Sequence, residues 1–265
     1  MRRSPAVAVF LILACSPLAL HAQQPTAPTR DPQAMSVLSN ALTALGGSAI
    51  AAIQDTVVQA TFTPPQGHGA GPGTVTFKTK GANKIRSDAS NGSATAVAIF
   101  NNGREFRTTP KGLTPAQSAN ADHKRIEHLP ALMLAQELAR TDFSATYVGK
   151  ETVEGHNVNH IRLFRISNRN SAADAQLTKN SELNVFVDAQ SSQIVKISFP
   201  YVAETDWRQS VPMEIYYDGY QTVNGIAVPF HVRTVFNGQP AGDLQVTSVA
   251  VNQGTPDSIF NGSQQ

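Results

Sequence analysis

Residues 183–199 read LNVFVDAQSSQIVKISF, and this stretch decides the class of the fold. Apolar Val195, Ile197 and Phe199 occupy alternate positions near its end, and the residues between them are polar. A period of two predicts a strand with one face in the core and the other in water. The opening of the stretch is also rich in strand-forming residues, and the polar residues 189–192 lie between the two segments. We therefore expect an antiparallel hairpin.

The same pattern recurs along most of the chain and predicts a mainly β fold with some α (α+β). Short turns join the segments, and Asn101-Asn102-Gly103 favours a tight hairpin because Asn-Gly accepts positive φ. Strands and helices do not alternate, so the strands are expected to pair antiparallel. We predict a curved antiparallel sheet, an unclosed half-barrel of about eleven strands. Val211–Asp218 and Tyr220–Val223 are expected as separate strands, and residues 111–122 and 168–180 as loops.

Two amphipathic helices are expected to cover the apolar face of this sheet. Asp31 is suited to cap the first helix and Pro32 to open it. The apolar residues that follow recur at intervals of three and four as far as Gly46-Gly47. A second helix is expected at residues 123–140, broken or initiated near Pro130. A sheet with one apolar face must bury that face, so we place both helices on its concave side; a plain β-sandwich is the alternative.

The N-terminus has the pattern of a secretory signal. Arg2 and Arg3 precede a short apolar run, and the small residue Ala22 marks a cleavage position. The run is too short to cross a bilayer, which takes about 20 residues. We therefore expect a periplasmic or secreted protein that is cleaved after Ala22. Lipid anchoring at Cys15, which lies in a loose lipobox, is the alternative.

The expected organisation is a signal peptide (1–22), a flexible lead-in (23–30), a single domain (31–260) and a short tail (261–265). The whole chain has 21 Lys and Arg against 19 Asp and Glu, and the two arginines of the signal account for the excess. A mature chain with balanced charge lacks the basic face that nucleic-acid binding requires. We expect no nucleic-acid partner, and a monomer.

The chain shows no recognisable catalytic, cofactor or metal motif. His156 and His160 are four residues apart on an expected strand, or about 13 Å, which is too far for one zinc ion. His123 and His128 do not share a helix face, so we interpret all four histidines as surface residues. No serine lies in a Gly-x-Ser-x-Gly turn. We expect no enzymatic activity, no cofactor and no metal; a hydrolase of envelope material is the less favoured alternative.

Several segments together carry a family resemblance. Ala41-Leu42-Thr43-Ala44-Leu45-Gly46-Gly47 ends the first helix, Leu129-Pro130-Ala131-Leu132 lies mid-chain, and Tyr216-Tyr217-Asp218-Gly219-Tyr220 precedes Val223-Asn224-Gly225-Ile226. With the signal before them, they resemble the bacterial LolA/LolB-like periplasmic lipoprotein carriers and their larger sorting-protein-like relatives. The resemblance implies an unclosed antiparallel barrel with a helical lid over an apolar cavity, which binds acyl chains without catalysis. By strand position, Arg86 is the nearest counterpart of the family's lid-holding arginine.

The expected partner is a hydrophobic ligand, such as an acyl chain or lipoprotein, with an envelope membrane protein as a further candidate. Ten apolar residues on the expected inward faces are predicted to line the ligand pocket: Val75, Phe77, Ile85, Val97, Ile99, Met133, Leu134, Phe186, Ile197 and Phe199. Periodicity does not distinguish a lined cavity from a solid core. An envelope interaction or sensory module with a filled core is therefore the alternative.

Overall fold

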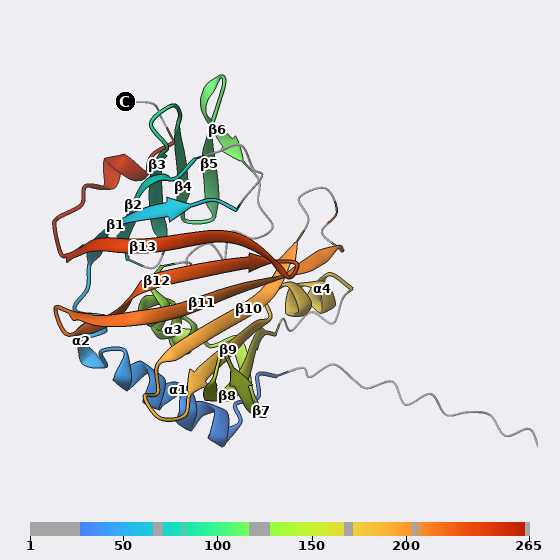
Figure 1. The fold of residues 1–265 in the computed structure, drawn as a ribbon. Helices are drawn as coiled ribbons and strands as arrows, with labels where there is room; N and C mark the ends of the chain where they lie inside the picture. The colour runs from blue at the N-terminus through green and yellow to red at the C-terminus, as the bar shows by residue number, and fades with distance from the viewer. Residues whose placement is uncertain are drawn as a thin grey trace, which may run out of the picture.

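The computed structural model describes residues 27–65, 71–81, 83–116, 128–166, 172–202, 206 and 208–262. These residues form one antiparallel sheet of thirteen strands, which is not closed into a barrel, and four α-helices (Figure 1). The strands are β1 (Asp55–Thr63), β2 (Gly73–Lys80), β3 (Lys84–Ser90), β4 (Thr95–Asn101), β5 (Arg104–Thr109), β6 (Gly112–Ala116), β7 (Phe143–Val153), β8 (His156–Arg165), β9 (Leu183–Asp188), β10 (Ile194–Val202), β11 (Ser210–Val223), β12 (Ile226–Phe236) and β13 (Gln239–Val251). The helices are α1 (Pro32–Ala44), α2 (Ser48–Ala51), α3 (Pro130–Ala139) and α4 (Ala172–Asn180), and a 3₁₀ turn, η2 (Asp257–Phe260), follows β13.

The sheet consists of two meanders that meet at β1 and β13. Its order is β6-β5-β4-β3-β2-β1-β13-β12-β11-β10-β9-β8-β7, so the first meander runs outward from β1 to β6. The second meander begins at the opposite edge with β7 and returns to β13, beside β1. In the sequence, α3 stands between β6 and β7, the two edge strands. The helix therefore belongs to the one connection that has to cross from one edge of the sheet to the other, and it lies against one face of the sheet (Figure 1).

The first helix begins and ends as the sequence predicts. The Asp31 carboxylate accepts hydrogen bonds from the backbone N–H groups of Gln33 (2.8 Å) and Ala34 (3.4 Å), and Pro32 opens the helix. After the helix, the Leu45 carbonyl accepts a hydrogen bond from Ala227 N–H at 3.0 Å. Gly46 makes this approach possible, because a Cβ there would lie 2.9 Å from the Gly225 carbonyl oxygen. The contact fixes the end of α1 against the start of β12.

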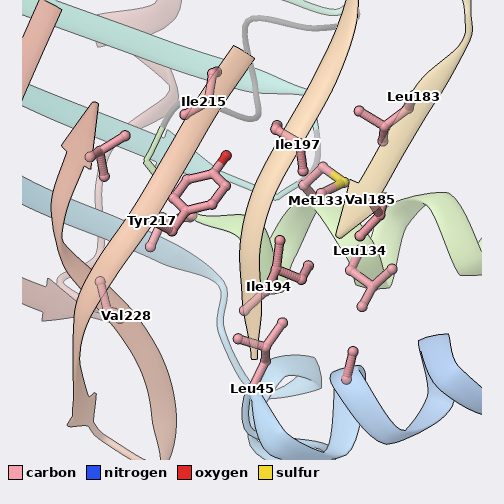
Figure 2. Packing of buried hydrophobic residues seen from close by; sticks show 14 of the residues in the cluster. Leu45, Met133, Leu134, Leu183, Val185, Ile194, Ile197, Ile215, Tyr217 and Val228 are labelled. Carbon is pink, nitrogen blue, oxygen red and sulfur yellow. The ribbon is translucent and has the colours of Figure 1, made fainter. Parts of the chain in front are cut away.

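Helices α1 and α3 cover the face of the sheet that we call the inner face, which carries Val185, Ile197 and Ile215. Cross-strand pairing places these three side chains in one row across β9, β10 and β11. Each is fully buried, and Figure 2 shows them facing Met133 and Leu134 of α3, with Leu45 at the end of α1 nearby. The predicted helix-covered half-barrel is thus confirmed, and the core lies between the inner face and the helices.

Four local features of the fold differ from the sequence-based expectation. Strand β6 lies within the expected loop 111–122, α4 lies within the expected loop 168–180, and α2 was not expected. The segments 211–218 and 220–223 form a single strand, because pairing with β12 continues from Asp218 to Tyr220 past Gly219. In each case pairing or packing with another segment outweighs a polar or glycine-containing local sequence. The sheet has thirteen strands, against the expected number of about eleven.

The alternation in β10 is also offset from the prediction. The register with β9 shifts between Ile194 and Lys196, which is the mark of a β-bulge. Ile194 is therefore fully buried in the core, whereas Val195 is half-buried. Beyond the bulge, Ile197 and Phe199 follow the predicted pattern.

The second helix begins at Pro130, at the initiation point that the sequence predicts. Residues 123–127 of that prediction, the signal peptide, its cleavage position and Cys15 lie outside the described residues. Across the ranges that the structure covers, no helix combines the length and the apolar character that crossing a bilayer requires.

Candidate functional site

A cleft of about 350 Å³ opens between the α1–α2 segment and α3. Its floor is formed by the end of β2 and the turn after α2. The volume falls within the range of about 300–1,000 Å³ that is usual for small-molecule sites. The lining consists of Leu42, Gly47, Ile50, Ala51, Ile53, Gln54, Thr79, Gly81, Leu132, Ala135, Gln136 and Ala139.

Helix α3 supplies one wall of the cleft because it is apolar on two faces. Leu132, Ala135 and Ala139 recur at helical spacing and line the cleft. Met133 and Leu134 lie on the other face and are buried in the core. The small alanine side chains leave room between α3 and α2, where a bulkier residue would close the cleft.

The polar groups in the cleft are few and uncharged. Thr79 is buried, and its hydroxyl is 2.6 Å from the Thr56 hydroxyl, so it is largely engaged within the sheet. Gln54 and Gln136 contribute amide side chains, which can donate and accept hydrogen bonds. The site can therefore hold an apolar group by burial and orient a neutral polar group through an amide.

A second, smaller hollow of about 200 Å³ lies on β2 to β5. Phe77, Ile85, Ser87, Phe100 and Glu105 are among its lining residues. Glu105 is buried and accepts a hydrogen bond at 2.6 Å from the Nε of Arg107. The two hollows are neighbours, because Thr79 of the first pairs across the strands with Ile85 of the second.

His128 immediately precedes α3 and is buried, which corrects the prediction of a surface histidine. Its ring stacks on Phe77 with 4.3 Å between ring centroids, and neither ring nitrogen has a hydrogen-bond partner among the described residues. Burial disfavours the charged imidazolium and lowers the pKa of His128 to about 4. The ring is thus a neutral part of the core near neutral pH.

The residues predicted to line a pocket fall into three groups. Six of them are packed in the core: Val75, Phe77, Met133, Leu134, Ile197 and Phe199. Ile85 lies on the inner face and lines only the second hollow, and none of the ten lines the larger cleft. Val97, Ile99 and Phe186 lie on the opposite, outer face of the sheet.

The positions of those three residues follow from strand register. Phe77 pairs with Ser87, and both side chains lie on the inner face. Ile99 pairs with Arg86 and Val97 with Asp88, the residues directly before and after Ser87. A shift of one residue moves a side chain to the other face. Ile99 is nevertheless one of the residues that line the second hollow.

Phe186 belongs to an outer-face stack with neighbouring strands. Its ring stacks on His160 at 4.3 Å between centroids, and the Lys196 ammonium lies 4.6 Å from the ring centroid. These long side chains cover Phe186 and leave it 5% exposed. The low exposure of Phe186 reflects burial under surface side chains, on the face opposite to the two helices.

Arg86, the expected lid-holding residue, has polar partners in β3 and in the C-terminal segment. On the outer face, it forms an ion pair with Asp88 (2.8 Å), and its Nη1 donates a hydrogen bond to the Ile259 carbonyl at 3.0 Å. It therefore secures the C-terminal turn η2 to β3. The lid-holding role of Arg86 stays a prediction.

The cleft residues Leu42, Ile53, Leu132 and Ala135 were missed by the sequence-based prediction. The available signal was the composition of α3, which reads PALMLAQELA and is apolar around most of its circumference. A helix apolar on more than one face has more than one apolar neighbour. Across the described residues, no group of three or more histidine, cysteine or acidic side chains is arranged to bind a metal ion.

Comparisons with known proteins identify the fold. A LolA superfamily protein from Nitrosomonas europaea matches with a TM-score of 0.56 at 13% identity, covering 86% of this chain and 97% of that one. A DUF1329 family protein from Desulfovibrio piger (TM-score 0.54, 11% identity) and an outer membrane lipoprotein-sorting protein domain from Vibrio parahaemolyticus (TM-score 0.53, 10% identity) have the same coverage. No protein-family model and no curated protein matches the sequence. The chain therefore has a LolA-like fold, which confirms the resemblance at the level of architecture.

Proposed function

We propose that this LolA-like protein is a non-enzymatic binding or carrier protein, which holds an acyl chain in the cleft between α1–α2 and α3. The observation that carries the proposal is the cleft itself, with an apolar lining of usable size between two helical walls. Burial contributes about 0.8 kcal/mol for each CH₂ group removed from water. An acyl chain could therefore bind without a charged anchor.

The cellular setting of the proposal comes from the N-terminus. Arg2, Arg3, the apolar run and Ala22 support export to the periplasm or beyond, with lipid anchoring at Cys15 as the alternative. The name of the Vibrio parahaemolyticus domain associates the same fold with sorting of outer membrane lipoproteins. A lipoprotein acyl group is accordingly the ligand class that we favour, and an envelope membrane protein is the partner that would deliver or receive it.

One observation favours a second candidate function. The space between α3 and the sheet is filled with side chains, among them Met133, Leu134 and Ile197. A filled core is expected of an envelope interaction or sensory module, which would use its surface rather than a pocket. Under this alternative the cleft would remain empty in the presence of acyl ligands.

A pair of tryptophan variants separates the two candidates. Ala135→Trp would fill the cleft from α3, whereas Ala44→Trp places the same side chain on the exposed end of α1, outside the lining. Binding of 1-monolauroylglycerol below its micelle concentration would be measured by calorimetry, and folding by thermal melting. We expect folded Ala135→Trp to bind at least about tenfold more weakly and Ala44→Trp to bind like the wild type. Equal binding by all three proteins would contradict the site.

A further inference from the structure

We propose that the cleft selects uncharged acyl groups, such as acyl esters and acyl amides, over free fatty acids and other charged amphiphiles. This inference rests on the proposed function and adds the ligand class to it. It is carried by the absence of ionisable side chains from the lining of the cleft, as far as the described residues form it. None of the twelve lining residues is ionisable.

The wall formed by α1, α2 and the following turn is uncharged over its whole length. Residues 32–54 contain no Asp, Glu, Lys, Arg or His, although many of them are exposed. Exposed helix faces in soluble proteins usually include charged side chains. On the other wall, α3 has one ionisable residue, Glu137, which does not line the cleft.

Three charged residues that adjoin lining residues in the sequence have partners outside the cleft. Lys80, which follows the lining residue Thr79, points to the outer face and donates to the Thr255 carbonyl at 2.9 Å. The carboxylate of Asp55, next to Gln54, is buried and accepts hydrogen bonds from the 253–255 segment. Arg140, at the end of α3, donates to Asp142 at 3.0 Å. A charged ligand head would therefore find no counterion among these groups.

The two amides suit a neutral head group instead. The side chains of Gln54 and Gln136 can each donate to a carbonyl and accept from an N–H or hydroxyl. An ester or amide would retain its hydrogen bonding in the cleft at no electrostatic cost. A carboxylate or quaternary ammonium moved to the same place would lose solvation without gaining a partner, which is unfavourable.

Three ligands with the same twelve-carbon length test the inference: 1-monolauroylglycerol, laurate and dodecyltrimethylammonium. Calorimetric titration at pH 8, below the micelle concentrations, gives their affinities for the intact protein. We expect laurate and dodecyltrimethylammonium to bind at least about tenfold more weakly than the neutral ester. Laurate binding within about threefold of the ester would overturn the selectivity while leaving the acyl site in place. Failure of the ester to bind would instead contradict the proposed function.

A charge inserted into the cleft provides the matched test. Gln136→Lys places a cation in the lining on a helix that accommodates lysine, and Asn40→Lys adds the same charge to an exposed position of α1 outside the lining. We expect Gln136→Lys to strengthen laurate binding by at least about threefold and to weaken dodecyltrimethylammonium binding. Asn40→Lys should change neither. Equal effects of the two variants would show that net charge, rather than the cleft, decides selectivity.

Discussion

His128 is a polar residue in an apolar environment. An imidazole with two polar nitrogens stacks on Phe77 in the core, and the described residues offer it no hydrogen bond. Leaving buried polar atoms unpaired is unfavourable. The His128 ring therefore stabilises the core by packing, while its two nitrogens lose their hydration without gaining a hydrogen bond. Its spacing from His123 indicated only that the two could not share a helix face. His128 is buried because α3 begins close to Phe77 of β2. The local sequence around His128 does not show this placement of the helix.

The lowered pKa of His128 predicts acid sensitivity. In the unfolded chain the histidine titrates near 6.5, and in the folded protein near 4. Between these values only the unfolded state binds the proton, so the free energy of unfolding falls as the pH falls from 6.5 to 4. The loss is about 1.4 kcal/mol per pH unit and about 3 kcal/mol in total. Urea unfolding at pH 7, 5.5 and 4.5 would measure it.

His128→Phe provides the comparison, because phenylalanine retains the stacked ring and has no group to protonate. We expect the difference in unfolding free energy between the two proteins to grow as the pH falls through this window. Parallel pH profiles would indicate that His128 titrates normally and is not held neutral in the core.

At the scale of elements, the C-terminal segment acts as a strap across the outer face of β1 to β4. Asp55 accepts backbone hydrogen bonds from Gln253 (2.8 Å) and Gly254 (3.0 Å). Burial alone would raise the pKa of Asp55, but these bonds and those from Thr255 outweigh it and hold the pKa below its usual value. Further along, Lys84 pairs with Asp257 at 2.6 Å. The strap ends in η2, where Phe260 is fully buried.

Loss of the Phe260 side chain should therefore weaken the whole fold. Phe260→Ala removes a fully buried ring from the contact of η2 with β3 and β4, and we expect a loss of about 3–5 kcal/mol. Phe236→Ala, at a ring that is 37% exposed, is the control and should cost much less. Chemical denaturation of both variants measures the difference. Similar losses in the two would mean that η2 is not an integral part of the domain.

The strand elements were more predictable than the segments that cover them. Two features could be predicted from local sequence, and the structure confirms both. They are the alternating burial of Ile197 and Phe199 and the start of α1 at Asp31-Pro32. Strand β6 has a short sequence with Pro115, and it forms because β5 offers a pairing edge. The bulge at Ile194 shifts the buried face by one residue, which no composition rule reveals.

At the scale of the whole molecule, the order of the two meanders creates the site. The chain leaves the sheet at β6 and re-enters at β7, and α3 in that connection lies beside α2 (Figure 1). The cleft lies between these two helical segments, which are about 80 residues apart in the sequence. Antiparallel architecture could be predicted from alternation along each strand. The cleft could not, because its walls are surfaces of separate elements that meet only in the fold.

Native mass spectrometry of residues 23–265 purified from a bacterial periplasm, with Ala135→Trp prepared in parallel, would show whether the cleft holds an acyl ligand. We predict a monomer that carries one acyl lipid or acyl peptide in the wild type, and a bare chain in the variant. Solvent extraction would identify the ligand as an ester or amide. A wild-type mass that stays bare after incubation with neutral lipids and lipopeptides would contradict the account and favour an interaction module with a filled core.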